Sequence, residues 1–331
     1  MDIYFRADAN DLIGGGHVMR CLGLAQFFRS QGAHPVLIAR KSGAPAIREW
    51  TSNDLEVRYI DVPIGCSQSE VPQVIDQVNA LRSDPIMILD GYDFHGDYMS
   101  RLKSSGFKLV TLDDVAKKEI LSDMVVNPNV GAHSNFSYSE SRVGRMLLGE
   151  QYAILREDVL NSRHVGGDGL LITLGSTDPH NIGLQIIEIL EQENVDFRVH
   201  LINGGGQLAA IKLDKICSAN KLFSYSSVGR ILPYVIGCDV ALCAGGVTAS
   251  ELCYLGVPMS IVALADNQVP GSEKLAELGA AVVSSSLSDS IKRASDLVRN
   301  SELRLKMVQH QRGIIDGLGP ARIYEEIIRL T

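Results

Sequence analysis

The amino-acid sequence predicts an α/β fold in which two parallel-sheet domains face each other across a cleft. Short apolar runs alternate with amphipathic stretches of helical length, as is typical of strands and helices in a parallel sheet. The alternation stops between Leu155 and Gly169, where charged residues and glycines indicate a linker, and then restarts. A length of 331 residues also suits two domains. We therefore expect an N-terminal domain over residues 1–160 and a C-terminal domain over 161–331, whose final helix could pack back on the first domain.

The first domain is expected to begin with a strand and to alternate from there. Two stretches have the spacing of an amphipathic helix, Val18–Gln31 and Val71–Leu81. The apolar runs of strand length are Ile3–Arg6, Pro35–Ala39, Glu56–Ile60, Ile86–Leu89, Lys108–Leu112 and Met124–Val126.

The second domain is expected to restart with a strand at Leu170–Leu174 and a helix at Asn181–Gln192. The tail from Asp289 to Arg329 is predicted to be helical, with a break at Gly317–Pro320. Between them the alternation continues through Arg198–Ile202, Leu208–Ala219, Leu222–Tyr225, Val240–Cys243, Thr248–Leu255 and Met259–Val262.

Composition excludes several classes of protein. The net charge of -8 argues against a nucleic-acid binder, which needs a basic face for phosphates. No apolar run reaches the roughly 18 residues that span a bilayer, and the first residues do not resemble a signal peptide. The six cysteines show no Cys-x-x-Cys spacing, so we expect most of them to be small core residues. These features predict a protein of the reducing cytoplasm.

A glycine-rich segment between the first strand and the first helix is the strongest candidate for chemistry. Gly14, Gly15 and Gly16 let a ligand approach the backbone, and the helix start favours an anion. His17 follows at that start, where the helix dipole favours a neutral imidazole that can accept a proton. A plain glycine turn with an incidental histidine is the alternative.

A dinucleotide site is a weaker interpretation of the same segment. The third glycine of Gly-x-Gly-x-x-Gly is replaced by Met19, and no acidic residue ends the second strand. Arg40, which follows that strand, could still hold the 2′-phosphate of NADP.

A second glycine pair also joins a strand to a helix. Gly245 and Gly246 offer backbone amides at a helix start, which suits a diphosphate. Glu251, in the first turns of that helix, could accept hydrogen bonds from a ribose diol. The alternative is an acidic residue that only favours the helix dipole.

Four further segments follow predicted strands, and each also has a purely structural explanation. They could cap helices, form turns or pack at a sheet edge. They are Gly175-Ser176-Thr177-Asp178, Asn267-Gln268, Asp90-Gly91-Tyr92 and the acidic pair Asp113-Asp114. No spacing typical of a metal site occurs, and no Gly-x-Ser-x-Gly elbow of a serine hydrolase is present.

These residues together resemble a known family, the UDP-2,4-diacetamido-2,4,6-trideoxy-β-L-altropyranose hydrolases of pseudaminic acid biosynthesis. More widely they resemble the GT-B glycosyltransferases. The N-terminal signature consists of Arg6-x-Asp8, Ile13-Gly14-x-Gly16-His17, Arg20 and Leu24-Ala25. The matches reach to about Leu278 through Asp90-x-Tyr92, Leu112-Asp113-Asp114, Asn127-x-Asn129, Tyr152-Ala153-x-Leu155-Arg156, Gly175 to Asp178, Gly246 to Glu251, and Asn267-Gln268.

The resemblance implies two Rossmann-like domains, with UDP held mainly by the second. It implies that His17 is the base, that Asn267 contacts UDP, that water attacks the anomeric carbon, and that neither a metal nor a cofactor is needed. We expect the sugar to meet Arg6, Asp8, Gly14, Gly15, Gly16, Arg20, Tyr92 and Asp178. We expect UDP to meet Gly175, Ser176, Gly245, Gly246, Val247, Thr248, Glu251, Asn267 and Gln268.

Two alternatives to the hydrolase stay open from the sequence. A GT-B glycosyltransferase would use the same UDP-sugar but pass the sugar to an acceptor. An NADP-dependent oxidoreductase would use the first glycine loop instead. Besides its UDP-sugar, the expected partners could include other enzymes of the sugar pathway, but neither nucleic acid nor a membrane.

Overall fold

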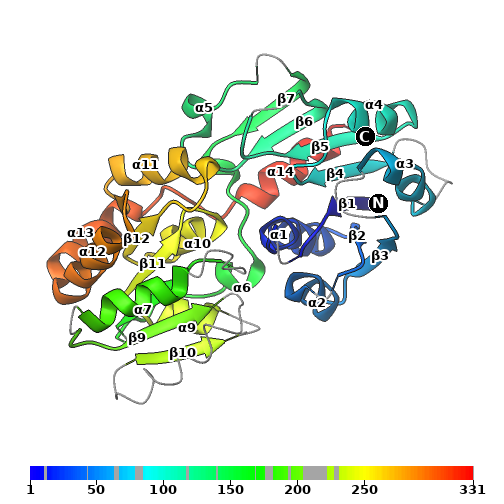
Figure 1. Cartoon of the computed structure of the whole chain (residues 1–331). Coiled ribbons are helices and arrows are strands. Elements are labelled where there is room, and N and C mark those ends of the chain that lie inside the picture. Colours follow the sequence, from blue (N-terminus) through cyan, green and yellow to red (C-terminus); the bar gives the residue numbers. More distant parts are fainter. Residues whose placement is uncertain are drawn as a thin grey trace. The chain divides into compact units, whose positions relative to one another are not determined.

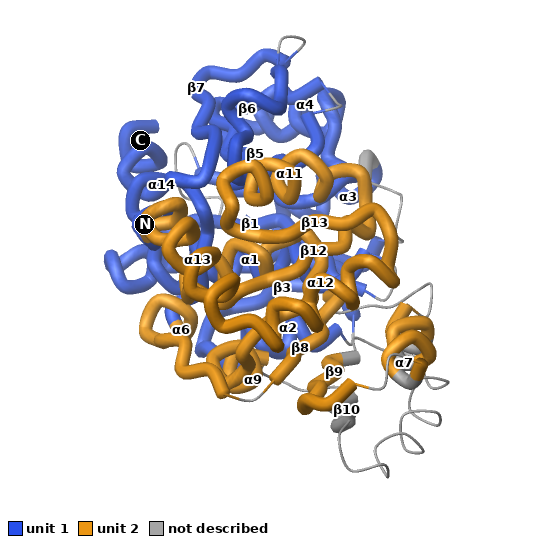
Figure 2. Tube along the Cα trace, turned by 90° about the vertical axis from the view of Figure 1, so that its left-hand side faces the viewer, with its two compact units in different colours: residues 1–157, 317–331 blue, residues 158–316 orange. Residues whose placement is uncertain are grey.

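The computed structural model divides the chain into two compact units, coloured separately in Figure 2. The first combines Met1–Glu157 with Gly317–Thr331, and the second is Asp158–Asp316. The short helix α6 (Glu157–Leu160) lies where the first unit passes into the second. The structure describes residues 1–10, 13–42, 44–62, 67–78, 85–116, 119–138, 141–167, 169–175, 182–192, 195–203, 222–226 and 231–330.

The first unit is built on a seven-stranded sheet with the order β3-β2-β1-β4-β5-β6-β7, in which all neighbours are parallel. Its strands are β1 (Asp2–Ala7), β2 (His34–Arg40), β3 (Glu56–Ile60), β4 (Ile86–Asp90), β5 (Lys108–Leu112), β6 (Leu121–Asn127) and β7 (Arg142–Leu148). Its other elements are α1 (Gly16–Ser30), α2 (Pro45–Ser52), α3 (Ser67–Asp76), α4 (Gly96–Ser104), α5 (Ala132–Asn135), η1 (Glu150–Tyr152) and α14 (Gly319–Ile328).

Helices cover both faces of this sheet, as Figure 1 shows. Successive residues of a strand point to opposite faces, so Ile3 and Phe5 of β1 pack in one core and Tyr4 in the other. The first core includes residues of α1, α2 and α14, and the second includes residues of α3 and α4. Burial on both faces explains why the central strands read as continuous apolar runs in the sequence.

The second unit repeats this plan with a six-stranded parallel sheet, ordered β10-β9-β8-β11-β12-β13. Its strands are β8 (Leu170–Thr173), β9 (Val199–Asn203), β10 (Leu222–Ser226), β11 (Val240–Ala244), β12 (Met259–Val262) and β13 (Val282–Ser284). Its other elements are α7 (Ile182–Gln192), α9 (Leu232–Gly237), α10 (Val247–Leu255), η2 (Asp266–Gln268), α11 (Val269–Glu277), α12 (Leu287–Arg299) and α13 (Ser301–Gln311).

The predicted fold class is confirmed, but several elements were not anticipated. The edge strand β7 is exposed along most of its length and carries two arginines, so no apolar run marks it. The helices α2, α4, α9 and α11 and the short strand β13 are also additional. The predicted helix Leu208–Ala219 lies outside the described residues.

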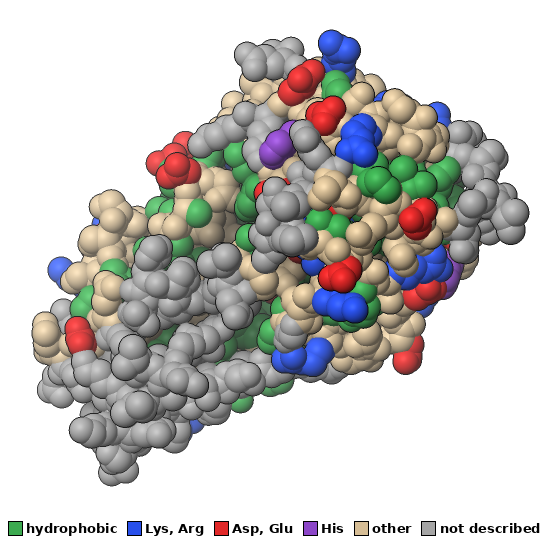
Figure 3. All heavy atoms as spheres, turned by 45° about the vertical axis from the view of Figure 1, so that its right-hand side comes forward, with side chains coloured by type: hydrophobic (Ala, Val, Ile, Leu, Met, Phe, Trp, Pro, Cys, Tyr) green, Lys and Arg blue, Asp and Glu red, His purple; other side chains and the backbone are tan. Residues whose placement is uncertain are grey.

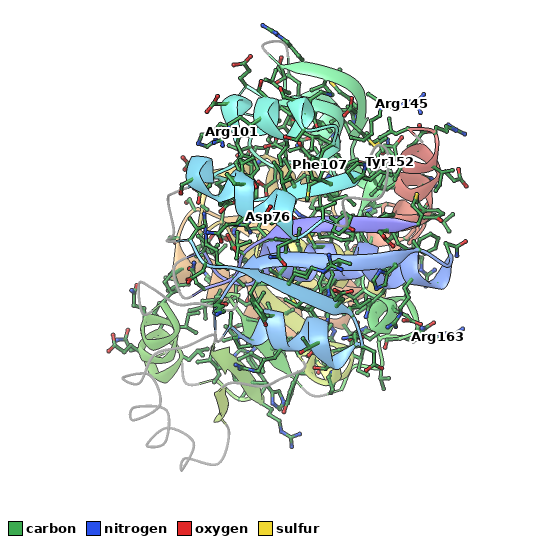
Figure 4. All side chains as sticks on the ribbon, turned by 90° about the vertical axis from the view of Figure 1, so that its right-hand side faces the viewer. Asp76, Arg101, Phe107, Arg145, Tyr152 and Arg163 are labelled. Atoms are coloured by element: carbon green, nitrogen blue, oxygen red, sulfur yellow. The ribbon has the colours of Figure 1, made fainter. Side chains whose placement is uncertain are left out.

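The end of the chain belongs to the first unit rather than to the range 161–331 expected for the second domain. In α14, Tyr324 packs on Phe28 of α1 with ring centroids 5.1 Å apart. At Gly319 a side chain would collide with the backbone of Ala153, so this helix start needs a glycine. Arg145 of β7 and Tyr152 of η1 lie beside the same helix in Figure 4.

Two properties of the described part of the chain bear on the classes excluded above. No helix within it is long and apolar enough to cross a membrane. On the face shown in Figure 3, acidic and basic side chains are interspersed over the described surface. The described surface of that face has no continuous basic stripe of the kind that binds the phosphates of a nucleic acid.

Candidate active site

The strand order of the first sheet reverses between β1 and β4, which are neighbours although two strands and three helices separate them in sequence. Ligands of open α/β sheets bind beyond the carboxyl ends of the strands at such a reversal. The register pairs Ala7, the last residue of β1, with Asp90, the last residue of β4, and pairs Asp90 with Leu112 of β5. The residues that follow these positions therefore lie where a ligand site is expected.

The glycine loop after β1 is folded by local hydrogen bonds. The Asn10 side chain accepts the Ile13 N–H at 3.0 Å, and the Asn10 carbonyl accepts the Gly14 N–H at 2.9 Å. Gly14 has a φ of 72°, a conformation that favours glycine. Gly15 is the N-cap of α1 and provides no side-chain cap, and α1 then begins at Gly16. The loop therefore delivers His17 into the first turn of α1.

His17 is held by a buried carboxylate at the reversal point. Its Nδ1 lies 2.6 Å from Oδ1 of Asp90, which is fully buried. The ring of Tyr92 meets the imidazole edge-on, with centroids 4.8 Å apart, and is itself 42% exposed. When Nδ1 donates to a carboxylate, the lone pair of the ring lies on Nε2, where it can accept a proton. This is the arrangement of a histidine base with an orienting acid.

Arg20, one turn further along α1, binds the same carboxylate with two nitrogens. Its Nε lies 2.9 Å from Asp90 Oδ2 and one terminal nitrogen 2.7 Å from Oδ1, while the other terminal nitrogen lies 3.3 Å from Asp114. Burial alone would raise the pKa of Asp90, but the charge of Arg20 and the contact with His17 lower it to about 2. We call His17, Arg20, Asp90, Tyr92 and Asp114 the Asp90 cluster.

The two neighbouring acids after β5 point to different places, as adjacent residues commonly do. Asp114 joins the Asp90 cluster through Arg20. Asp113 instead accepts the Tyr138 hydroxyl at 2.7 Å and the backbone N–H of Ala116 at 2.8 Å, and burial raises the pKa of its carboxyl group. Only Asp114 of the pair is therefore placed to influence His17.

Arg6 and Asp8, expected to meet the sugar, lie in a second ionic network. Arg6 is fully buried and binds both oxygens of Glu70, at 2.9 and 3.0 Å, as well as Asp8 at 2.7 Å. Arg40 binds Asp8 at 2.9 Å and Glu70 at 2.7 Å, and the Tyr98 hydroxyl donates to Glu70 at 2.9 Å. We call these five residues the Glu70 cluster. Its contacts are internal, so it holds the loop that follows β1.

The same network bears on the dinucleotide alternative. Arg40 is the residue that could have held a 2′-phosphate, but its two terminal nitrogens bind carboxylates of the Glu70 cluster. Its backbone N–H also donates to Asp8 at 2.8 Å. A cation engaged with two buried carboxylates offers little charge to a phosphate, so this arrangement disfavours the NADP interpretation.

In the second unit the strand order reverses between β8 and β11. Gly246 precedes α10 there as its N-cap, so Val247 and Thr248 open the helix with N–H groups that have no intrahelical acceptor. Gly245 is committed to the protein, because its N–H donates to the Gln268 side chain at 3.2 Å. A Cβ at Gly245 would also collide with the Ser272 hydroxyl.

Gln268 connects two loops of this edge rather than standing free for a ligand. Its side-chain oxygen also accepts the N–H of Leu264, at 3.0 Å, so it ties the loop after β12 to the loop after β11. Asn267 is half-buried beside it. Glu251 is the fifth residue of α10, beyond its first turn, and is 6% exposed. Gly175 is exposed after β8, whereas Ser176 and Asp178 lie outside the described residues.

The sequence analysis singled out the Asp90-Gly91-Tyr92 segment but did not foresee the contact of Asp90 with His17, and it missed Glu70 altogether. Asp90 and Glu70 act on partners 73 and 64 positions away, so no local spacing reveals them. The signal that existed was an acidic residue at the buried end of an apolar strand or on an otherwise apolar helix face. Such a charge is unfavourable without a partner, which implies that one is present.

Comparisons with known proteins add relatives at low identity, and no family model matches the chain. An uncharacterized protein of Methanocaldococcus jannaschii is 23% identical over 277 residues, which cover 79% of this chain and 55% of that protein. The chain thus spans about half the length of that relative. A UDP-2,4-diacetamido-2,4,6-trideoxy-β-L-altropyranose hydrolase of Campylobacter jejuni is 23% identical over 205 residues, covering 59% of this chain and 68% of the hydrolase.

Solved structures match nearly the whole chain at lower identity. MurG of Acinetobacter baumannii has a TM-score of 0.65 at 15% identity, covering 99% of both chains. The spinosyn forosaminyltransferase SpnP has a TM-score of 0.69 at 14% identity, covering 100% of this chain and 99% of the transferase. A putative UDP-N-acetylglucosamine 2-epimerase of Listeria monocytogenes has a TM-score of 0.64 at 14% identity, covering 99% of this chain and 96% of the epimerase. With its two parallel α/β units, the chain therefore has the GT-B fold.

Proposed function

We propose that this protein is a hydrolase that releases UDP from a UDP-linked 2,4-diacetamido-2,4,6-trideoxy hexose, in pseudaminic acid biosynthesis. The observation that carries the proposal is His17, anchored through Nδ1 to the buried Asp90 at the reversal point of the first sheet. The similarity to the Campylobacter jejuni hydrolase supports the substrate class. The glycosyl hydrolysis needs a base for water, and His17 supplies one.

In the proposed reaction, Nε2 of His17 removes a proton from a water molecule as the oxygen attacks the anomeric carbon. A carbon–oxygen bond forms on one face while the bond from that carbon to the UDP oxygen breaks on the other. The electron pair of the broken bond stays on the β-phosphate of UDP, and the sugar leaves with inverted configuration. Asp90 stabilises the imidazolium that results, because its carboxylate accepts a hydrogen bond from Nδ1–H and carries the opposite charge.

The second unit offers a candidate site for the UDP part. The N–H groups of Gly246, Val247 and Thr248 at the start of α10 suit a diphosphate without a metal. Glu251 and Asn267 are the residues proposed to contact the nucleoside. Gln268 is proposed to act indirectly, since its side-chain oxygen already holds two loops together.

This placement can be tested by calorimetry with UDP alone. Replacing Glu251 by Ala should weaken UDP binding by roughly 1–3 kcal/mol if ribose hydroxyls lose their acceptor. The matched control is Glu273→Ala, which removes the same group from α11 in the same unit and should leave UDP affinity unchanged. Unchanged affinity in both Glu251→Ala and Asn267→Ala would contradict the placement.

The reaction itself is tested by turnover in ¹⁸O-labelled water after dialysis against a chelator. Attack on carbon puts the label in the free sugar, provided that it is measured before exchange through the open-chain form. Label in UDP would reveal attack on phosphorus and would overturn the role given to His17. Activity that disappears on chelation and returns with Mg²⁺ or Mn²⁺ would overturn the metal-independent part.

A glycosyltransferase is the second candidate, because a named sugar transferase, SpnP, is among the solved structures of this fold. That enzyme class needs an acceptor, whereas the proposed hydrolase needs only water. Mass spectrometry of products with and without a candidate acceptor separates the two. UDP and free sugar formed without acceptor support the hydrolase, and a product formed only with acceptor supports the transferase.

A further inference from the structure

The guanidinium of Arg20 bonds carboxylates through all three of its nitrogens, which uses three of its five N–H groups. Each of its three nitrogens lies within hydrogen-bond distance of one: Nε and one terminal nitrogen bind Asp90, and the other terminal nitrogen binds Asp114. Its side chain is only 6% exposed. A guanidinium that is buried and paired with carboxylates is poorly placed to bind a sugar, although the sequence analysis placed Arg20 among the sugar-binding residues. Its position suggests a different task.

That task concerns the plane of the Asp90 carboxylate. Oδ1 of Asp90 lies 2.6 Å from His17 Nδ1 and accepts a hydrogen bond from a terminal nitrogen of Arg20, and Oδ2 accepts from Arg20 Nε. A carboxylate bound by two parallel N–H groups of a guanidinium cannot rotate without breaking one of them. A lysine would supply charge but not this planar fork. Asp114, in turn, holds the guanidinium from its other side.

We propose that Arg20 is a positioning residue, which locks the Asp90 carboxylate so that Oδ1 faces His17 and thereby fixes the imidazole as its Nδ1–H tautomer. Only that tautomer leaves Nε2 with a lone pair. The catalytic consequence rests on the proposed function, but the tautomer itself is a property of the free protein and can be measured without any substrate.

The experiment is nuclear magnetic resonance of histidine-labelled protein, with ¹⁵N in both ring nitrogens. At about pH 8.5 ordinary histidines are neutral, so the ¹⁵N shifts and ring-proton couplings report the tautomer directly. The spectrum of His17→Asn assigns the His17 signals among the eight histidines. We expect the Nδ1–H form to dominate in the native protein and to lose that dominance in Arg20→Lys.

Arg40→Lys is the matched control, because it makes the same change in the other ionic cluster of the same unit. It should leave the His17 tautomer unchanged even if it lowers stability, so a general loosening of the fold is distinguished from the proposed effect. An Nδ1–H form that stays equally dominant in Arg20→Lys would overturn the proposal. If Arg20→Lys does not fold, Arg20→Gln, whose amide has a single nitrogen and cannot bind both oxygens of Asp90, must shift the tautomer in the same direction.

Kinetics separate this proposal from the proposed function. With a UDP-sugar that the native protein hydrolyses, Arg20→Lys should lower kcat roughly 10- to 100-fold, as expected for a misplaced base, with little change in KM. A raised KM at unchanged kcat would instead indicate direct sugar binding by Arg20 and would overturn the proposal. A tautomer shift in a protein that hydrolyses no UDP-sugar would leave the positioning role standing and remove the hydrolase.

Discussion

The Glu70 cluster and the Asp90 cluster lie at the same edge of the first sheet and share one design, an arginine that binds both oxygens of a fully buried carboxylate. They differ in what surrounds that pair. In the Glu70 cluster, two arginines bind two carboxylates, and the hydroxyl of Tyr98 donates to Glu70 beside the fully buried Arg6–Glu70 pair. In the Asp90 cluster, one arginine meets two carboxylates, and the remaining partner is a histidine.

The two clusters differ in net charge, and this difference distinguishes a network that only stabilises the fold from one that can take up a proton. With neutral His17, the Asp90 cluster carries one more negative than positive charge, and a proton taken up by the imidazole would balance it. The buried charges of the Glu70 cluster are already balanced, since Arg6 and Arg40 face Asp8 and Glu70, while Asp93, which lies 3.9 Å from Arg40, is half-exposed to solvent. We therefore expect such an ion pair to hold a loop in place in the Glu70 cluster and, under the proposed function, to prepare His17 as a base in the Asp90 cluster. The predictions below test that division.

The largest expected effect is the loss of the base. His17→Asn should lower kcat by a factor on the order of 10²–10⁴, because the water loses its proton acceptor. UDP affinity, measured by calorimetry, should change little, since the nucleotide is assigned to the second unit. His34→Asn is the matched control, because His34 is exposed at the start of β2 and should leave kcat near the native value. Near-native turnover of His17→Asn would reduce His17 to a helix-start residue.

The next effect concerns stability in the Glu70 cluster. Glu70→Gln removes the charge that faces Arg6 and Arg40, and an uncompensated buried charge costs about 3–5 kcal/mol. The single tryptophan, Trp50, is buried in α2 of the first unit, so its fluorescence during urea unfolding reports this unit.

Asp114→Asn provides the comparison in the other cluster. Asp114 is partly exposed and Arg20 keeps Asp90, so this change should cost less than about 1 kcal/mol. Equal losses of unfolding free energy in Glu70→Gln and Asp114→Asn would contradict the division between the two clusters.

The sequence predicted those features of the fold and site that depend on residues close together in the chain. The strand and helix alternation follows from apolar periodicity, and the Gly14–Gly16 loop with His17 forms one continuous segment, so both were visible. The edge strand β7 was not, because most of its residues are exposed and Arg142, Gly144 and Arg145 interrupt its apolar residues. The partners of His17 and Arg6 were also hidden, since they depend on β1 lying beside β4 and on α3 packing against the sheet.

The two hydrogen bonds that Gln268 accepts were hidden from the sequence for the same reason. An amide after a strand predicts either a ligand contact or a turn, and the sequence left both open. Its bonds to Gly245 and Leu264 join loops that are 19 residues or more apart within the second unit, and only the parallel pairing of β11 with β12 brings those loops together. The local sequence marks such a polar residue as a candidate site residue, but its hydrogen-bond partners depend on which strands pair in the sheet.

Acid unfolding tests the Asp90 pair. Burial opposes ionisation of Asp90, but Arg20 and His17 outweigh it and lower the pKa from 3.8 to about 2. Because the folded pKa lies below the unfolded one, the stabilisation is present above about pH 4 and is lost as the pH falls toward 2. It amounts to about 2 kcal/mol. In Asp90→Asn, the unfolding free energy followed by Trp50 fluorescence should therefore fall less steeply over this range. If the unfolding free energy of Asp90→Asn falls as steeply with pH as that of the native protein, the stabilisation does not come from the lowered pKa of Asp90.

The smallest expected effect comes from two tyrosine hydroxyls, one in each cluster. The hydroxyl of Tyr98, whose side chain is 1% exposed, donates to Glu70, and Tyr98→Phe should lower unfolding free energy by about 1 kcal/mol, because Glu70 keeps its arginine donors. Tyr92→Phe keeps the ring that meets His17 and removes a hydroxyl that interacts with the carboxylate of Asp114; because the residue is 42% exposed, stability should fall by only about 0.5 kcal/mol. The effects on kinetics should rank the other way. Tyr92→Phe should alter kcat or KM, and Tyr98→Phe should leave both near their native values. If Tyr98→Phe changed the kinetics more than Tyr92→Phe, the Glu70 cluster would have to serve the reaction as well as the fold.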